Sequence, residues 1–170
     1  MCVLEYVKLR LLLLLRRIII LFMSDRINIK NKKAYYQYQI LEKYIAGIQL
    51  LGTEIKSIRA GKASIAEAYC YIKGSELYVK SMHVAEYDPA SYNNHEPLRE
   101  RKLLLNRNEL KKLEKKLKNQ GLTIVPLSVF INNNGYAKIQ IALAQGKKTH
   151  DKRHAIKEKD IKRELDRKGH

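Results

Sequence analysis

Cysteine is scarce in this sequence of 170 residues, and tryptophan is absent. The two cysteines, Cys2 and Cys70, lie far apart and outside any CxxC pattern. This excludes a disulfide framework and a structural zinc site built on cysteine, and it is typical of the reducing cytoplasm. The five histidines give one pair at helical spacing, His150 and His154, but a zinc site needs three or four ligands. We therefore expect no metal and no other cofactor.

The motifs that carry most enzyme chemistry are also missing. The sequence contains no Walker loop, no GxGxxG, no GxSxG and no HExxH. Asp151 lies between His150 and His154, but we expect this segment to be mobile, and catalytic groups could not be held in position there. We expect no catalytic residues and no enzymatic activity.

Acidic residues are outnumbered by basic ones, and long uninterrupted apolar runs are lacking. The 34 Lys and Arg against 17 Asp and Glu give a formal net charge of +17, which favours nucleic acid as a partner and, second, an anionic membrane surface. Residues 1–22 are largely apolar, but Arg16 and Arg17 interrupt them, and a central Arg costs about 2.5–3.5 kcal/mol on membrane insertion. We interpret 1–22 as a mis-assigned leader ahead of a native start at Met23, with an interfacial amphipathic anchor as the alternative.

Punctuated apolar segments predict a mainly β domain over residues 35–145. Residues 35–51 are expected to form two short strands with a bend at Ala46-Gly47. Strand-like runs on both sides of Lys73-Gly74-Ser75, and again on both sides of 132–135, predict two hairpins. In the second hairpin, period-two alternation places one set of residues on a shared face: Val125, Leu127, Val129 and Ile131, meeting Ile139, Ile141 and Leu143.

Two short helices complete this domain. Residues 53–59 follow Gly52 and end at Gly61, which predicts the first helix. Asn106 and Glu109 have the spacing of a capping box and predict the start of the second, whose Leu110, Leu113 and Leu117 form one apolar stripe. The Lys-rich opposite face of that helix is interpreted either as a solvated surface or as an RNA contact. About six strands and two helices predict a small OB-like β-barrel.

The ends of the domain differ from it in composition. Residues 23–34 are polar and basic and are interpreted as a flexible arm. From Gly146 onward there are ten Lys or Arg, five Asp or Glu and few apolar anchors. Such a segment cannot bury enough apolar surface to offset the entropy lost on ordering. We expect 146–170 to be a basic tail that is disordered until it folds against a polyanion.

A basic barrel with a basic tail predicts binding to RNA, since small barrels combine cations with stacking aromatics. The cations available for phosphates are Lys32, Lys33, Lys56, Arg59, Lys62, Arg99, Arg101 and Lys102. The aromatics available for bases are Tyr35, Tyr36 and Tyr38, although ordinary strand packing explains them equally well.

Five sequence blocks make this more specific. In order, they are Asn31-Lys32-Lys33-Ala34, Ala46-Gly47-Ile48-Gln49-Leu50, Gly52-Thr53-Glu54-Ile55-Lys56-Ser57-Ile58-Arg59-Ala60-Gly61-Lys62, Arg101-Lys102-Leu103-Leu104-Leu105-Asn106 and Gly146-Lys147-Lys148-Thr149-His150-Asp151-Lys152-Arg153. Together they resemble the SsrA-binding protein (small protein B) family of bacterial trans-translation, over about residues 28–163.

The resemblance implies an OB-like barrel that binds the tRNA-like domain of transfer-messenger RNA (tmRNA). It implies delivery of that RNA, together with elongation factor Tu bound to it, to stalled ribosomes for rescue and tagging. The tail would enter the decoding centre and the empty messenger channel and fold there as a helix. A monomer in the cytoplasm, with no membrane partner, fits this function. The alternative is a generic basic OB-like RNA-binding or ribosome-associated protein without selectivity for tmRNA.

The resemblance also assigns residues. Those expected to face RNA are Asn31, Lys32, Lys33, Tyr36, Tyr38, Lys56, Arg59, Gly61, Lys62, Lys102, Leu104 and Asn106. Those expected to bind the ribosome are Gly146, Lys147, Lys148, His150, Asp151, Lys152, Arg153, Ile156 and Lys157. For Asn106 the alternative is a helix cap, and for Leu104 it is the core. The chain departs from the family pattern at Ile45, where an acidic residue is frequent, and at Tyr36-Gln37, where His-Glu is frequent.

Overall fold

The structure is a computed structural model that describes residues 27–90, 93–118 and 121–147. Its strands are β1 (Asn28–Lys30), β2 (Tyr38–Ile48), β3 (Ala63–Ser64), β4 (Tyr69–Lys73), β5 (Glu76–Lys80), β6 (His83–Val84), β7 (Arg101–Leu104), β8 (Leu122–Ile131) and β9 (Ala137–Gly146). Its helices are α2 (Lys32–Gln37), α3 (Gly52–Arg59), α4 (Arg107–Leu117) and the short 3-10 helix η1 (Asp88–Ala90). Both expected hairpins, β4–β5 and β8–β9, and both expected helices, α3 and α4, are confirmed.

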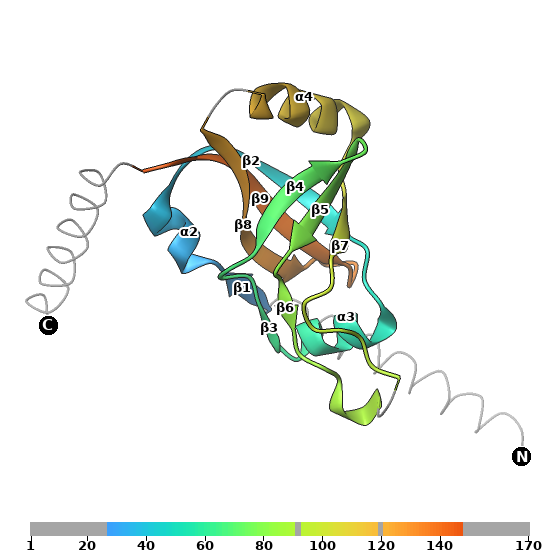
Figure 1. Ribbon diagram of the computed structural model, residues 1–170. Coiled ribbons are helices and arrows are strands. Elements are labelled where there is room, and N and C mark those ends of the chain that lie inside the picture. Colours follow the sequence, from blue (N-terminus) through green and yellow to red (C-terminus); the bar gives the residue numbers. More distant parts are fainter. Residues whose placement is uncertain (1–26, 91–92, 119–120, 148–170) are drawn as a thin grey trace, which may run out of the picture.

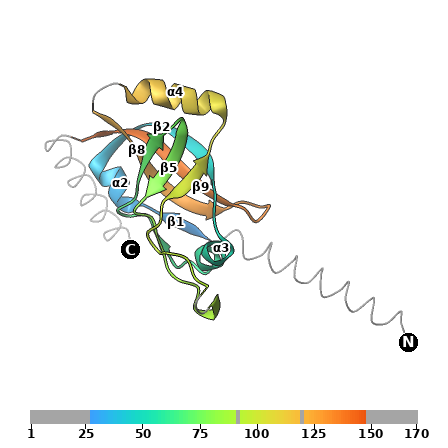
Figure 2. The ribbon, with the colours of Figure 1, turned by 45° about the vertical axis from the view of Figure 1, so that its right-hand side comes forward.

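One curved sheet forms the body of the molecule (Figure 1). Its seven strands follow the order β1-β8-β4-β5-β7-β2-β9, and β8 also pairs with β9. The pairing therefore returns to β8, although a single residue pair, Cys70 with Ile124, joins β4 to β8. Helix α4 lies across one end of this sheet, and α3 lies near the opposite end (Figures 1 and 2). The expected mainly β, OB-like fold with short helices is confirmed.

Strand β2 is continuous, whereas two short strands with a bend were expected. It pairs with β9 from Tyr38 opposite Gly146 to Gly47 opposite Lys138. Ala46 is fully buried, and Gly47 pairs with Leu104 of β7. The two small residues therefore serve close packing between strands, and the prediction of a bend at this point was wrong.

Residues 28–34 are ordered in β1 and α2, whereas they were expected to belong to a flexible arm. Strand β1 pairs with β8. Asn31 then caps α2, because its Oδ1 accepts a hydrogen bond from the Ala34 backbone N–H at 3.0 Å. Its Nδ2 donates to the carbonyl oxygens of Ile65 at 2.9 Å and Pro126 at 3.2 Å. These three bonds fix the segment against two distant parts of the chain.

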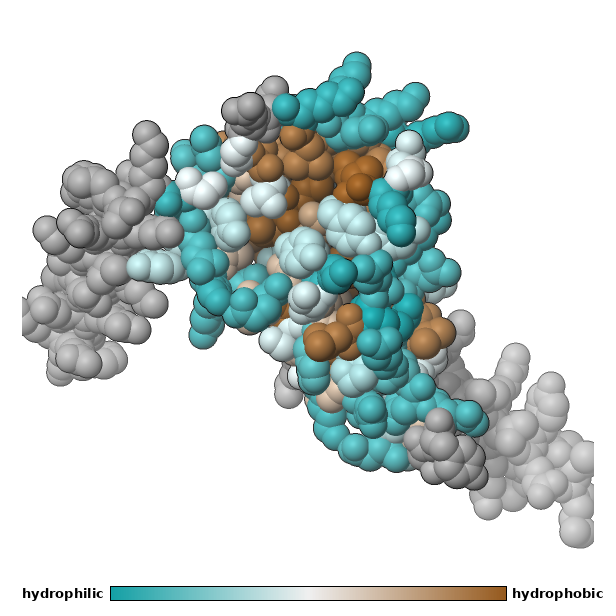
Figure 3. All heavy atoms as spheres, viewed as in Figure 1, coloured by the Kyte–Doolittle hydropathy of each residue, from teal (hydrophilic) through white to brown (hydrophobic). Residues whose placement is uncertain are grey.

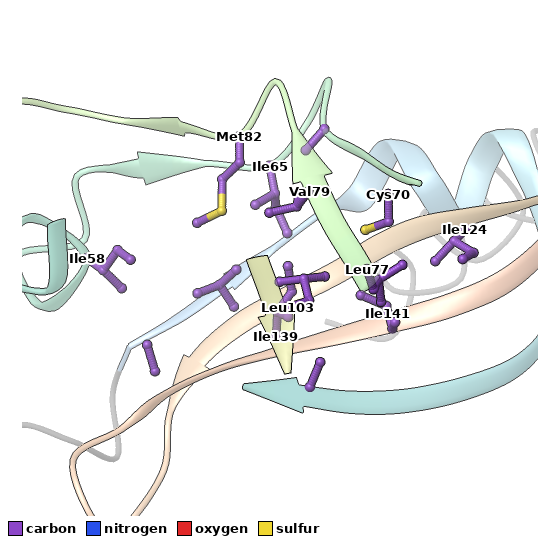
Figure 4. Close-up of a cluster of buried hydrophobic side chains, with 14 of the residues drawn as sticks. Ile58, Ile65, Cys70, Leu77, Val79, Met82, Leu103, Ile124, Ile139 and Ile141 are labelled. Atoms are coloured by element: carbon purple, nitrogen blue, oxygen red, sulfur yellow. The ribbon is translucent and has the colours of Figure 1, made fainter. Parts of the chain in front are cut away.

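Two apolar clusters form the core. The larger fills the curved sheet, and Figure 4 shows Leu77, Leu103, Ile139 and Ile141 pointing together there. The smaller lies beneath α2 and consists of Ala34, Val125, Leu127, Ala142 and Ala144, with Tyr38 and Ile40 packed against it.

A register shift in the β8–β9 hairpin separates these clusters. It falls between Pro126 and Ser128, so the alternation of β8 reverses at that point. Val129 faces the larger cluster, whereas Val125 and Leu127 face the smaller one. The expectation that all the odd-numbered residues of β8 share one face was therefore wrong.

The ends of the chain are outside this description. The interpreted leader, 1–22, and the tail residues from Lys148 onward lie outside the described residues. Among the residues that are described, no helix is long and apolar enough to cross a bilayer.

Candidate nucleic-acid interface

A groove of about 460 Å³ lies where the ends of β2 and β7 meet α3 and the β8–β9 turn. It is lined by Gly47, Ile48, Leu50, Ile55, Arg59, Leu104, Asn134, Gly135, Tyr136, Ala137 and Lys138. Two residues predicted to face RNA, Arg59 and Leu104, come together here from different elements. The groove combines apolar, aromatic and cationic side chains, which is the mixture that RNA-binding surfaces use for sugars, bases and phosphates.

Leu104 and Gly47 form the inner part of the groove. Along β7 the side chains of Arg101 and Leu103 are buried, whereas Leu104 points outward and is 54% exposed. Gly47 is its partner on β2, and a Cβ added at Gly47 would lie only 3.3 Å from the Leu104 Cβ. The core alternative for Leu104 is therefore wrong, and its exposed side chain offers an apolar contact to a ligand.

Arg59 and Tyr136 form the rim of the groove. Arg59 Nη2 donates a hydrogen bond to the carbonyl oxygen of Gly135 at 3.0 Å, which joins α3 to the β8–β9 turn. Gly135 has φ of +80°, a left-handed conformation that favours glycine. The Tyr136 side chain is 67% exposed. An exposed Tyr ring beside a guanidinium can stack on a base while the cation meets a phosphate.

The other predicted residues of this region lie on α3 or just after it. Lys56 lies over the ring of Tyr87, with its Nζ 4.9 Å from the ring centroid. Lys62 pairs with Asp88 at 2.7 Å, and both side chains are largely exposed. Between them, Gly61 has φ of +73° and ends the helix. Exposed pairs of this kind contribute little to stability, so a phosphate can replace Asp88 beside Lys62 at small cost.

A buried ionic network fixes α3 against β7. The Glu54 carboxylate accepts hydrogen bonds from Arg99 Nε at 2.6 Å, from Arg101 Nε at 2.8 Å and from the Leu51 backbone N–H at 2.7 Å. Burial raises the pKa of Glu54, but the bonds from Arg99 and Leu51 and the nearby positive charges outweigh it and hold the pKa below its ordinary value. The network fixes the position of Arg59 relative to Leu104.

Arg99 and Arg101 were assigned to phosphates, and for Arg101 this is wrong. The Arg101 side chain is fully buried, and its Nη1 donates to the Met82 and Arg99 carbonyl oxygens. Arg99 is partly exposed but already binds Glu54. The sequence alone does not show whether a basic residue is exposed to a ligand or paired with an acidic residue inside the protein.

Lys102 and Asn106 lie beside the groove rather than in it. Lys102 pairs with Glu76 on the outer surface of the sheet and is half-buried. Asn106 caps α4, where its backbone N–H donates to the Glu109 carboxylate at 3.4 Å, and its side chain is exposed. The cap position leaves the Asn106 side chain accessible, so the two roles considered for this residue are compatible.

A second group of predicted residues lies around α2, on the other side of the sheet from α3 (Figures 1 and 2). Lys32 and Tyr36 are exposed, and Lys33 pairs with Glu67 at 2.6 Å. Tyr38 is only partly exposed, because it packs against the smaller apolar cluster. Asn31 is 4% exposed and makes the three bonds described above, so its assignment to RNA was wrong.

The predicted tail begins as part of the barrel. Gly146 is the last residue of β9. The Lys147 backbone N–H donates to the Gln37 carbonyl oxygen at 2.9 Å, and its Nζ donates to the Tyr35 carbonyl oxygen at 3.2 Å. The other predicted tail residues are outside the described part: Lys148, His150, Asp151, Lys152, Arg153, Ile156 and Lys157.

Several groove residues were not predicted. Tyr136 and Lys138 follow the turn of the β8–β9 hairpin, and an exposed Tyr next to a Gly turn was a usable signal. Ile48 and Leu50 belong to a matched sequence block but were interpreted as strand residues. Ile45, the departure from the family pattern, is 59% exposed on β2, two residues before Gly47. Its position near the groove follows from the pairing of β2 with β7 and β9, which the sequence alone does not show.

Comparison with known proteins gives consistent matches. A family model described as "SmpB protein" matches residues 28–170. An SsrA-binding protein of Phocaeicola vulgatus is 60% identical over 141 residues, which cover 83% of this chain and 94% of that protein. An SsrA-binding protein of Christiangramia forsetii is 58% identical over 146 residues, covering 86% and 93%. A chain from a solved structure described as "tmRNA-SmpB: a journey to the center of the bacterial ribosome" is similar with a TM-score of 0.62 and 45% identity, covering 72% of this chain and 86% of that one.

Proposed function

The chain belongs to the SmpB protein family, and on this basis we propose that it binds tmRNA and delivers it to the ribosome in trans-translation. The function is one of binding, and we assign no reaction to the chain. The part of tmRNA that it recognises is the tRNA-like domain, and the ribosomes it serves are those stalled on a message. Elongation factor Tu joins through the RNA, and the protein acts as a monomer in the cytoplasm.

The groove between α3, β7 and the β8–β9 turn is the observation that carries this proposal. It presents the exposed side chains of Leu104 and Tyr136 together with the cation of Arg59. A purely electrostatic RNA coat needs only cations, whereas this groove adds apolar and aromatic contacts in a shape fixed by the Glu54 network. Such a surface can distinguish one folded RNA from others.

The tail is assigned to the ribosome. Residues from Lys148 onward carry nine Lys or Arg and five Asp or Glu, and a chain of this composition folds only when a partner offsets the entropy of ordering. The predicted ribosome-binding residues from Lys148 to Lys157 belong to this segment. We propose that it enters the messenger channel at the decoding centre.

Competition binding at physiological salt tests the RNA specificity. Labelled tRNA-like domain of tmRNA is bound to the protein and challenged with unlabelled tRNA-like domain, bulk tRNA or unstructured RNA. Efficient competition by the tRNA-like domain alone is the expected result. Equal competition per nucleotide by all three RNAs would show that the protein is a generic basic RNA binder, because charge alone does not discriminate among them.

A further inference from the structure

Helix α4 carries a cationic face that the groove does not use. Arg107, Lys111 and Lys115 follow one another at four-residue spacing, which places them on one side of an α-helix. Lys112, Lys116 and Lys118 widen that side, and we call these six residues the α4 cationic face. The apolar stripe of Leu110, Leu113 and Leu117 lies on the opposite side and packs on the core. In Figure 3, hydrophilic side chains project from α4 at the edge of the molecule.

Few of these charges are neutralised within the protein. In the part of the chain that the structure describes, Lys116 is the one member of the α4 cationic face that pairs with a carboxylate, that of Glu42. Of the two acidic residues of α4, Glu109 binds the backbone at the helix start, and Glu114, at the border of the α4 cationic face, is in none of the ion pairs of the described residues. Like charges spaced four residues apart destabilise a helix. A face that served solubility alone would do better with mixed signs, so its uniform charge points to an anionic partner.

The chemistry of the α4 cationic face distinguishes the kinds of nucleic acid. Single-stranded RNA is bound by cations together with aromatic rings that stack on bases. The outward side of α4 has no aromatic residue: it carries the six cations and Asn108, with the half-buried Glu114 at its border. Lysines on a rigid helix contact phosphates without reading bases. The partner that fits is the phosphate backbone of double-helical RNA.

The position of α4 indicates which RNA this is. Leu104 lies in the groove and is followed, two residues later, by Asn106, which caps α4. The helix of 11 residues extends roughly 16 Å from that point at 1.5 Å per residue. The α4 cationic face thus begins at Arg107, three residues after Leu104, so an RNA seated in the groove can extend onto it. We propose that the α4 cationic face binds the backbone of a double-helical segment of the same RNA that occupies the groove. This inference rests on the proposed function.

The test compares two double variants of the full-length protein. Lys111→Gln/Lys115→Gln removes two charges from the α4 cationic face, and Gln has a helix propensity close to that of Lys. Lys30→Gln/Lys73→Gln is the matched control, with exposed lysines on β1 and β4. A third protein, Lys111→Arg/Lys115→Arg, keeps the charge. For each, the affinity for the tRNA-like domain is measured over a range of salt concentrations, and thermal unfolding confirms the fold.

Loss of two phosphate contacts should make the slope of log K against log salt less negative by about 1.5 in the α4 Gln variant. The control should change by less than about 0.5, and the Arg variant should retain the wild-type slope. Equal slopes in the α4 Gln variant and the control would overturn the inference. It would also be overturned if the α4 Gln variant lost affinity for ribosomes while its slope for the tRNA-like domain stayed the same. Failure of the wild-type protein to prefer the tRNA-like domain would instead refute the proposed function.

Discussion

The shape of the groove depends on residue 47 being glycine, which has no side chain. Glycine there lets Leu104 lie against the β2 backbone, since a Cβ would come within 3.3 Å of the Leu104 Cβ. Real Cβ atoms rarely approach so closely, so any larger residue must displace Leu104. Because Leu104 is 54% exposed, the displacement changes the groove more than the core.

We therefore expect Gly47→Ala to weaken binding of the tRNA-like domain about five- to tenfold, or about 1 kcal/mol, with the fold retained. Gly52→Ala is a matched control, because a Cβ at Gly52 would meet nothing within 4 Å. Equilibrium binding of both variants at one salt concentration measures the effect. Wild-type affinity in Gly47→Ala would show that the position of Leu104 does not matter for binding.

At the scale of single residues, the sequence predicted chemistry better than location. Leu104 and Arg59, which the recognised motifs predicted to face RNA, line one groove, and their contact with RNA stays a prediction. Asn31 and Arg101 were misplaced because a polar or charged residue type gives no information on its burial. Asn31 is bonded to Ile65 and Pro126, and Arg101 to Glu54 and Met82. Each of these contacts joins segments that are distant in sequence.

At the scale of elements, Glu54 holds α3 against β7. Its carboxylate is fully buried between Arg99 and Arg101, and it also accepts a bond from the Leu51 backbone at the helix start. Removing one partner of such a buried pair leaves an uncompensated charge, which typically costs 3–5 kcal/mol. Loss of this pair should change the orientation of α3, and with it the wall of the groove that α3 forms.

Glu54→Gln should lower the free energy of unfolding by about 3–5 kcal/mol at neutral pH. The pKa of Glu54 in the folded protein lies below its ordinary value of 4.5. The stabilisation that the Glu54 charge gives the folded protein is therefore complete above about pH 4.5. It is lost as the pH falls through the lower pKa that Glu54 has in the folded state. Urea unfolding from about pH 7 to about pH 3 should show the difference between wild type and variant shrinking below about pH 4.5.

Glu67→Gln is the control for this titration, since Glu67 forms an exposed pair with Lys33. Exposed pairs contribute about 0–1 kcal/mol, so this variant should unfold almost as wild type does at every pH. A difference between wild type and Glu54→Gln that stays constant down to about pH 3 would contradict the role given to the Glu54 charge.

The elements that the sequence predicted well are those with local signals. The β4–β5 and β8–β9 hairpins have glycine turns, and α4 has a capping box and a leucine stripe. Helix α2 and the reversal in β8 were not predicted, because both depend on contacts between distant segments. The cap of α2 is oriented by bonds from Asn31 to Ile65 and Pro126, and the register shift in β8 divides two apolar clusters. The periodicity of apolar residues along the sequence predicts neither the cap of α2 nor the register shift in β8.

At the scale of the whole molecule, β9 separates the groove, which we propose binds RNA, from the tail, which we propose binds the ribosome. Its first residues, Ala137 and Lys138, line the groove, and its last, Gly146, leads to the tail. Ten residues of strand span roughly 30 Å at 3.3 Å per residue. Lys147 is bonded to the backbone at the end of α2, so the tail begins at a fixed distance from the RNA groove. The barrel thus acts as a spacer between the two regions.

This separation predicts the effect of removing residues 148–170. A truncation after Lys147 keeps every pair of β9 with β2 and removes a net charge of only +4, nine Lys or Arg against five Asp or Glu, from the +17 of the chain. We expect the affinity for the tRNA-like domain to fall no more than about threefold at physiological salt, because the groove and α4 are unchanged. Tagging of nascent chains on stalled ribosomes should be abolished.

A scrambled 148–170 of the same composition is the control, and it should bind RNA but fail to support tagging if the order of the tail residues matters. Loss of most RNA affinity on truncation would show that the tail, rather than the barrel, binds tmRNA.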